Sequence, residues 1–226
     1  MPIYDIRLLI FLLPAFLLSL LAQLLVKSAY ARAMQIAART SGFAAARHIL
    51  DAAGLQSVAI EQIPGRMSDH YDPRAKVLRL SQDVYHGRSL AAVGIAAHEA
   101  GHALQDAKHY APLIIRNAAV PAANFGSGLG MLFLFLGVAL VLQPLLLVGI
   151  VVFSATVVFQ VVNLPVEFDA SARAKRQLVD LGIVDAQELR WVKKVLNAAA
   201  LTYVAATLQS VMTLLYYVLR YMGRRN

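Results

Sequence analysis

The feature that most constrains this chain is where charged residues are missing. Three stretches contain no Asp, Glu, Lys or Arg: Leu8–Val26 with 19 residues, Asn117–Val166 with 50, and Val195–Leu219 with 25. A helix needs about 20 apolar residues to span a bilayer, so the outer stretches fit one span each and the middle one fits two. The sequence therefore predicts an α-helical membrane protein with four transmembrane helices.

The composition agrees with this prediction. Hydrophobic residues make up 59% of the 226 residues and charged residues only 15%, against about 45–50% and 25% in soluble domains. The absence of cysteine excludes disulfides and cysteine-based metal sites. Within the middle stretch, Gln143-Pro144 is the expected turn, which gives spans near 122–142 and 145–163. The first stretch could instead be a cleaved signal peptide, because Ala29-Tyr30-Ala31 has the A-x-A form, but its apolar run is longer than such peptides use.

The net charge of +8 is explained by membrane topology, so no nucleic-acid partner is predicted. Basic residues gather directly after the first span, at Lys27, Arg32, Arg39 and Arg47. The positive-inside rule then places residues 27–116 in the cytoplasm, and two further spans return residues 167–194 to the same side. The basic tail, Arg220, Arg224 and Arg225, does not fit this arrangement unless the last segment does not fully cross.

The polar segments predict a small α+β zincin-like cytoplasmic domain. An amphipathic helix is expected over residues 28–53, ended by Gly54, and a second from an N-cap at Ser89 to about Ala107. Between them lie three short strands with turns at Pro64-Gly65 and Asp72-Pro73-Arg74: Ser57–Ile63, Arg66–Tyr71 and Val77–Leu80.

The second polar region follows the predicted hairpin. Pro165 is expected to begin a helix that ends at Gly182, and Asp185-Ala186-Gln187-Glu188 resembles a capping box that opens the final helix. The predicted organisation is an N-terminal anchor, a metal-helix domain, a transmembrane hairpin, a third-ligand segment, and a C-terminal span with its tail, at residues 1–27, 28–116, 117–166, 167–194 and 195–226.

The helix from Ser89 carries the strongest chemical signal, the pattern H-E-x-x-H at His98-Glu99-Ala100-Gly101-His102. Positions i and i+4 share a helix face, so both imidazoles can bind one Zn²⁺. Glu99 adjoins the first ligand and can act as a general base toward water. The alternative is that the two histidines bind no metal and are surface or core residues whose ring nitrogens form ordinary hydrogen bonds.

A zinc site of this kind needs a third protein ligand. The metzincin pattern fails, because Gln105 replaces its glycine and His109 comes one position too late. Glu167 is the candidate: it begins the first polar segment after the hairpin and is the only glutamate between Glu99 and Glu188. The alternative for Glu167 is a carboxylate that interacts with a helix N-terminus.

Four runs carry a family resemblance: Met67-Ser68-Asp69-His70-Tyr71-Asp72-Pro73, Leu78-Arg79-Leu80-Ser81, residues 96–103, and Leu164-Pro165-Val166-Glu167-Phe168-Asp169-Ala170-Ser171. Together they resemble the neutral zinc metallopeptidases of bacterial membranes (YugP-like proteins), relatives of membrane gluzincins such as the heat-shock membrane protease and the CAAX prenyl protease. The resemblance implies that Glu167 is the third zinc ligand. These relatives usually have an aspartate where this chain has Ser171, so Asp169 is an alternative for orienting the histidines.

Three further residues are weaker candidates. His70 and Tyr71 lie on a predicted strand that in gluzincins binds extended substrate, although a polar turn is an equal alternative. Arg173 could stabilise a developing oxyanion, or be a solvated or lipid-facing arginine.

The prediction is therefore a zinc metalloendopeptidase of the bacterial inner membrane, with its active site at the cytoplasmic face and a peptide or membrane-protein substrate. A non-proteolytic metal-binding scaffold or chaperone is the alternative, and the adjacent base Glu99 argues against it. A transporter is disfavoured because no charged residue lies within a predicted span.

Overall fold

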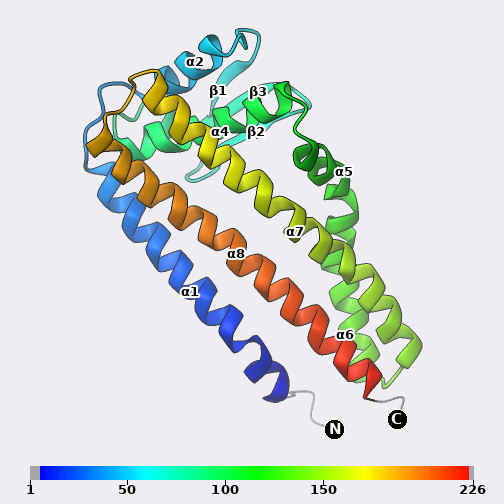
Figure 1. Cartoon of the computed structure of the whole chain (residues 1–226). Helices are drawn as coiled ribbons and strands as arrows, with labels where there is room; N and C mark the ends of the chain where they lie inside the picture. Colours follow the sequence, from blue (N-terminus) through cyan, green and yellow to red (C-terminus); the bar gives the residue numbers. More distant parts are fainter. Residues whose placement is uncertain (1–5, 224–226) are drawn as a thin grey trace. The chain divides into compact units, whose positions relative to one another are not determined.

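The structure is a computed structural model that describes residues 6–223 (Figure 1). Helices make up 76% of the described residues, and the chain divides into two compact units. One unit holds Ile114–Pro165 with the described ends of the chain up to Ala22 and from Thr202. The other holds Gln23–Leu113 and Val166–Leu201.

Between residues 6 and 223, four helical segments are long and apolar enough to cross a membrane, as predicted: Leu8–Met34, Ala111–Ala139, Gln143–Asp180 and Ala186–Met222. They belong to α1 (Ile6–Met34), to α5 (Ala111–Phe125) with a π-helical turn η1 (Gly126–Gly130) and α6 (Met131–Ala139), to α7 (Gln143–Asp180), and to α8 (Ala186–Met222). The hairpin turn lies at residues 140–142, before the expected position. Gln143-Pro144 instead opens α7, because proline is preorganised for the first helical turn.

The unit that contains α6 is held together by close helix packing. A Cβ added at Gly137 would lie 2.5 Å from the Leu146 backbone nitrogen, and one at Gly149 would lie 2.6 Å from that of Leu134. Small residues allow such backbone approach between membrane helices. Other large apolar side chains of this unit face outward, such as Val151 at 62% exposure, which suits contact with lipid. Arg224 and Arg225 of the predicted tail lie outside the described residues.

The other unit contains the small α+β domain. It consists of α2 (Gly42–Ala52), β1 (Ala59–Ile63), β2 (His70–Asp72), β3 (Val77–Ser81), α3 (Gln82–Tyr85) and α4 (Leu90–Ala107), with the ends of α1, α7 and α8. The sheet order is β1-β3-β2, with β1 parallel and β2 antiparallel to β3. Its core is continuous from α2 through β3 and α4 to α7 and α8, with fully buried members such as Ile49, Leu78, Leu178 and Val192.

The helix predicted over residues 28–53 is wrong, because two helices share this range. α1 continues to Met34, and α2 begins at Gly42 with Ser41 as its N-cap. The segment between them pairs with the backbone before α4: Ala38 N–H donates to Arg88 O, and Leu90 N–H donates to Ile36 O. The end at Gly54 is confirmed, and its φ of +76° is the left-handed conformation that glycine adopts readily.

The strand predicted over Arg66–Tyr71 is wrong in extent. Only His70–Asp72 pairs with β3, because Met67 has a φ of 55° and turns the chain before it. Pro64-Gly65 turns the chain as expected, yet its flanking strands do not pair with each other, since β3 lies between β1 and β2. The turn at Asp72 is confirmed: its Oδ1 accepts hydrogen bonds from the backbone N–H groups of Arg74 and Ala75.

The prediction that Pro165 begins a helix is also wrong. Pro165 lies in the interior of α7, so Glu167 is not in a first helical turn. An interior proline removes one backbone hydrogen bond and costs about 3 kcal/mol. Tertiary packing offsets this cost, because the residues that follow form a completely buried stripe at every fourth position: Val166, Ala170, Ala174 and Leu178. The helix end at Gly182 and the capping box between Asp185 and Glu188 are confirmed.

Candidate metal centre

The candidate site is built on α4, whose start is determined by Ser89. The Ser89 hydroxyl accepts a hydrogen bond from Ala92 N–H, as predicted for an N-cap. This start places His98 and His102 one turn apart within a single helix. Their rings lie 4.8 Å apart between centroids at 82°, and both project from the same face.

Gly101, inside the H-E-x-x-H pattern, sets the approach of α7 to α4. A Cβ at this position would lie 2.6 Å from the carbonyl oxygen of Ala170, a contact too short for any side chain. Because the obstructing atom belongs to the backbone, rotation of a side chain cannot relieve it. The glycine therefore allows α7 to lie close enough for Glu167 to face the histidines.

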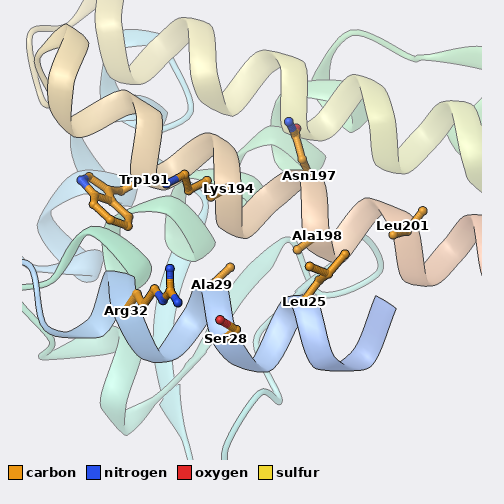
Figure 2. A pocket seen from close by; sticks show the side chains of 9 residues that line it. All are labelled: Leu25, Ser28, Ala29, Arg32, Trp191, Lys194, Asn197, Ala198 and Leu201. Atoms are coloured by element: carbon orange, nitrogen blue, oxygen red, sulfur yellow. The ribbon is translucent and has the colours of Figure 1, made fainter. Parts of the chain in front are cut away.

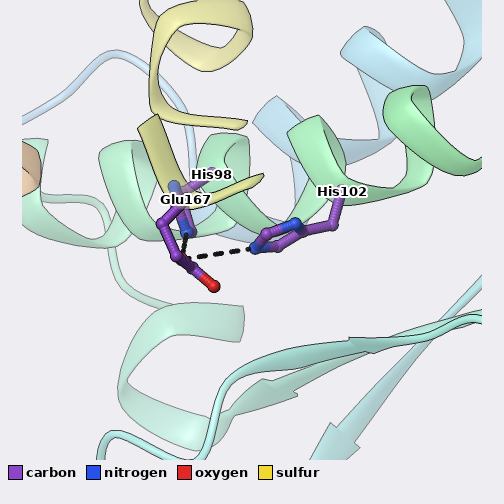
Figure 3. A group of neighbouring side chains, drawn as sticks. All are labelled: His98, His102 and Glu167. Atoms are coloured by element: carbon purple, nitrogen blue, oxygen red, sulfur yellow. Dashed lines mark ion pairs between the residues drawn. The ribbon is translucent and has the colours of Figure 1, made fainter. Parts of the chain in front are cut away.

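The three predicted ligands converge (Figure 3). Glu167 Oε2 lies 3.3 Å from His98 Nε2 and 3.7 Å from His102 Nε2, and one potential ligand atom from each residue lies within 4.8 Å of the others. The side chains of His98, His102 and Glu167 are only 13%, 9% and 9% exposed. Tetrahedral ligands at about 2.0–2.1 Å from zinc are separated by about 3.4 Å, so the donor spacing suits this ion.

One atom of this cluster has the two imidazoles beside it but no hydrogen bond. Glu167 Oε2 is buried and makes no hydrogen bond within the described chain. A buried carboxylate oxygen without a partner is costly, and coordination of a cation is one way to satisfy it. The donor set of two imidazoles and a carboxylate is one that catalytic zinc sites use. The residues therefore fit a zinc ion.

Gln105 positions His102 and was missed as a site residue by the sequence analysis. Its amide nitrogen donates to Val166 O and to Asp169 Oδ2, both at 2.8 Å. Its Oε1 consequently faces His102 Nδ1 at 3.0 Å and must accept a hydrogen bond from it. With the proton on Nδ1, the Nε2 lone pair of His102 is free for a metal.

Ser171 and Asp169 have different contacts. Ser171 Oγ lies 3.1 Å from His98 Nδ1, so the serine contacts the histidine although relatives usually have aspartate there. Asp169 reaches His102 only through Gln105, and its Oδ2 also pairs with Arg173 Nε at 2.5 Å. The Arg173 guanidinium also lies over the ring of Tyr110, 5.6 Å from its centroid. The Arg173 side chain is therefore only 21% exposed and is paired with Asp169.

Glu99 lies on α4 between the two histidines and is buried, at 9% exposure. Burial raises the pKa of the Glu99 carboxyl above its ordinary value, which brings it closer to the range suited to a general base. Burial lowers the pKa of His102, but the carboxylates of Glu167 and Glu99 outweigh this effect and the pKa is raised overall. The site thus stabilises positive charge, as a cation site requires.

The two strand candidates lie on β2, at one edge of the sheet. His70 is exposed, and its Nδ1 lies 2.8 Å from Ser68 O. The Tyr71 hydroxyl donates to Asp106 Oδ2 on α4 at 2.8 Å. Tyr71 therefore ties β2 to the metal helix, and the structure brings neither side chain into the three-donor cluster.

The close approach at Gly101 leads to a testable prediction. Gly101→Ala should push α7 from α4, lower the free energy of unfolding by about 1–3 kcal/mol, and weaken zinc binding because Glu167 moves with α7. Thermal unfolding and zinc content of the purified variant measure both effects. Gly94→Ala is the matched control, since its new Cβ would meet a methyl group of Val192 at 3.0 Å rather than backbone. Unchanged zinc affinity in Gly101→Ala would contradict the assigned role.

Comparisons with known proteins point to the same chemistry. The family model described as "Putative neutral zinc metallopeptidase" matches residues 8–222, which include the three donors. The "Putative membrane protease YugP" of Bacillus subtilis (strain 168) is 45% identical over 211 residues, or 92% of this chain and 94% of that protein. No solved structure matches the chain at a significant level.

Proposed function

The chain belongs to the family of neutral zinc metallopeptidases, and on that premise we propose that it is a membrane-anchored, gluzincin-like endopeptidase. The observation that carries the proposal is the convergence of His98, His102 and Glu167 around a buried carboxylate oxygen that has no hydrogen-bond partner. His98 Nε2, His102 Nε2 and Glu167 Oε2 would hold Zn²⁺. When bound, zinc would polarise the scissile carbonyl and acidify a water molecule.

The protein's own groups carry the proton chemistry. Glu99 accepts a proton from the attacking water and then delivers it to the leaving amine, so that one carboxyl serves as base and acid in turn. Gln105 and Ser171 hold the two imidazoles through their Nδ1 atoms. A metal-binding scaffold would need these contacts but would not need Glu99.

The proposed setting is the bacterial cell membrane, with the site at the cytoplasmic face. Support comes from the four apolar helices and from the basic residues that follow the first charge-free stretch. Two spans between α4 and Glu167 would return the third ligand to the side from which the chain entered. The substrate would then be a peptide or membrane-protein segment at that face.

Metal removal tests the proposed function. The full chain, purified in detergent, should bind one zinc and cleave a fluorogenic unfolded protein such as casein. A chelator should abolish cleavage, and stoichiometric zinc should restore it, because neither the carbonyl nor the water is activated without the ion. Zinc content is measured on the same samples as activity, which shows whether cleavage follows the amount of bound zinc. Full activity in zinc-free protein would overturn the proposal, while bound zinc without cleavage of any peptide would favour the scaffold.

A further inference from the structure

A pocket lies between the ends of α1 and α8 that belong to the same unit as His98, His102 and Glu167 (Figure 2). It has a volume of about 360 Å³, and none of the proposed zinc ligands lines it. Its nine lining residues are Leu25, Ser28, Ala29, Arg32, Trp191, Lys194, Asn197, Ala198 and Leu201. The pocket is thus separate from the proposed peptidase chemistry.

The pocket is amphipathic along its length. Figure 2 shows Arg32, Lys194 and Trp191 at one end and Leu25 with Leu201 at the other. The limits of two charge-free stretches fall within the pocket: one stretch finishes at Val26 on α1, and the other begins at Val195 on α8. The pocket therefore crosses the level at which both helices change from apolar to charged sequence. A tryptophan at such a boundary is typical of a membrane interface.

The polar end is cationic and lacks a compensating acid. No Asp or Glu lines the pocket, and neither Arg32 nor Lys194 forms an ion pair with any residue from 6 to 223. Lys194 Nζ lies 4.2 Å from the centroid of the Trp191 ring, which holds the ammonium at the pocket wall. Ser28 and Asn197 add polar groups to the lining, and Asn197 Oδ1 also accepts a hydrogen bond from Lys175 Nζ at 3.4 Å. An anionic ligand group is the complement of this end.

We propose that this pocket binds an anionic phospholipid. The phosphate contacts Arg32 and Lys194, and the upper part of one acyl chain lies along Leu25, Ala198 and Leu201. A free phosphate would use only the cationic end, whereas the apolar wall requires a ligand with a hydrocarbon part. Basic pockets between membrane helices bind acidic head groups by the same combination.

Trp191 is the only tryptophan in the chain, so its fluorescence reports on this pocket alone. The full chain is reconstituted into phosphatidylcholine vesicles that contain a small fraction of a brominated lipid, either phosphatidylglycerol or phosphatidylcholine. In both lipids the bromine atoms are on the acyl chain, close to the glycerol backbone. The expected result is stronger quenching by brominated phosphatidylglycerol than by brominated phosphatidylcholine at equal content. Equal quenching by the two lipids would overturn the proposal.

The double variant Arg32→Gln/Lys194→Gln should remove most of this preference and lower the relative affinity for the anionic lipid by about 25-fold, since each basic residue near an anionic membrane contributes about fivefold. Lys27→Gln/Lys193→Gln is the matched control: it removes two exposed cations from the same helices outside the pocket lining. The control should keep the preference. Because Lys194 contacts the indole ring, each variant is judged by its own ratio of quenching by the two lipids.

Two further outcomes would count against the site. If the control variant loses the preference as fully as the double variant does, general surface charge explains the binding. If inorganic phosphate abolishes the preference while chloride at the same ionic strength does not, the pocket takes phosphate itself rather than the lipid. A preference that survives phosphate and depends on Arg32 and Lys194 supports the lipid site.

Discussion

Glu99→Gln should lower peptide hydrolysis by about 10²–10⁴-fold, the usual contribution of a general base. Glutamine has nearly the same shape as glutamate but cannot take a proton from water. Glu99 is not among the three donors that converge, so zinc content should be unchanged. The variant thus separates catalysis from metal binding, because it changes the rate and leaves the donors in place.

The measurement is steady-state hydrolysis of the fluorogenic protein by zinc-loaded enzyme, with metal content determined on the same sample. Glu61→Gln is the matched control, because it makes the same chemical change at an exposed carboxylate on β1 that pairs with Arg79 at 3.3 Å. Hydrolysis by Glu99→Gln at the parental rate would show that the assigned mechanism is wrong. A proteomic comparison of membranes that contain the wild type or the inactive variant would then identify substrates.

The parts of the site that follow from local sequence signals could be predicted. An N-cap serine, a helical repeat and two histidines four residues apart determine α4 and the face that carries His98 and His102. The capping box at Asp185 and the left-handed glycine at Gly182 are equally local, since the atoms that satisfy them lie within a few residues. Such signals need no knowledge of the tertiary structure.

Features that depend on tertiary packing could not be predicted. Pro165 is a helix breaker by local rules, and the buried stripe that keeps α7 continuous is visible only once α7 packs against the core. Gln105 is completely buried, but its partners His102, Val166 and Asp169 lie up to 64 residues away in the sequence. The one sequence signal was a polar amide within a mostly apolar helix, because such an amide needs hydrogen-bond partners wherever the helix is buried.

The strand order shows the same limit. Asp72 predicts its turn because the side chain bonds its own neighbouring backbone. The parallel pairing of β1 with β3 has no such local cause, because residues 18 positions apart meet in register. A short strand predicted from composition therefore does not indicate which strand it pairs with. The position of β2 at the edge of the sheet depends on its tertiary contacts with β3 and α4.

Glu167→Ala should remove zinc from the site. Loss of an outer partner of a ligand typically costs about 10–100-fold in metal affinity, and loss of a ligand itself should exceed about 100-fold. The expected result is zinc-free protein after dialysis against a weak chelator that leaves the wild type loaded. Activity should fall with metal content, in contrast to Glu99→Gln.

Asp169→Asn is the control that tests whether Asp169, the other carboxylate near the histidines on α7, is the third ligand in place of Glu167. Asp169 is already engaged by Gln105 and by Arg173, and its contact with the histidines is indirect, so this variant should lose zinc affinity by no more than the range for an outer partner. If Glu167→Ala kept its full zinc content while Asp169→Asn lost it, Asp169 would be the third ligand. The buried Oε2 of Glu167 argues for the opposite result, because it faces both imidazole nitrogens and makes no hydrogen bond within the described chain.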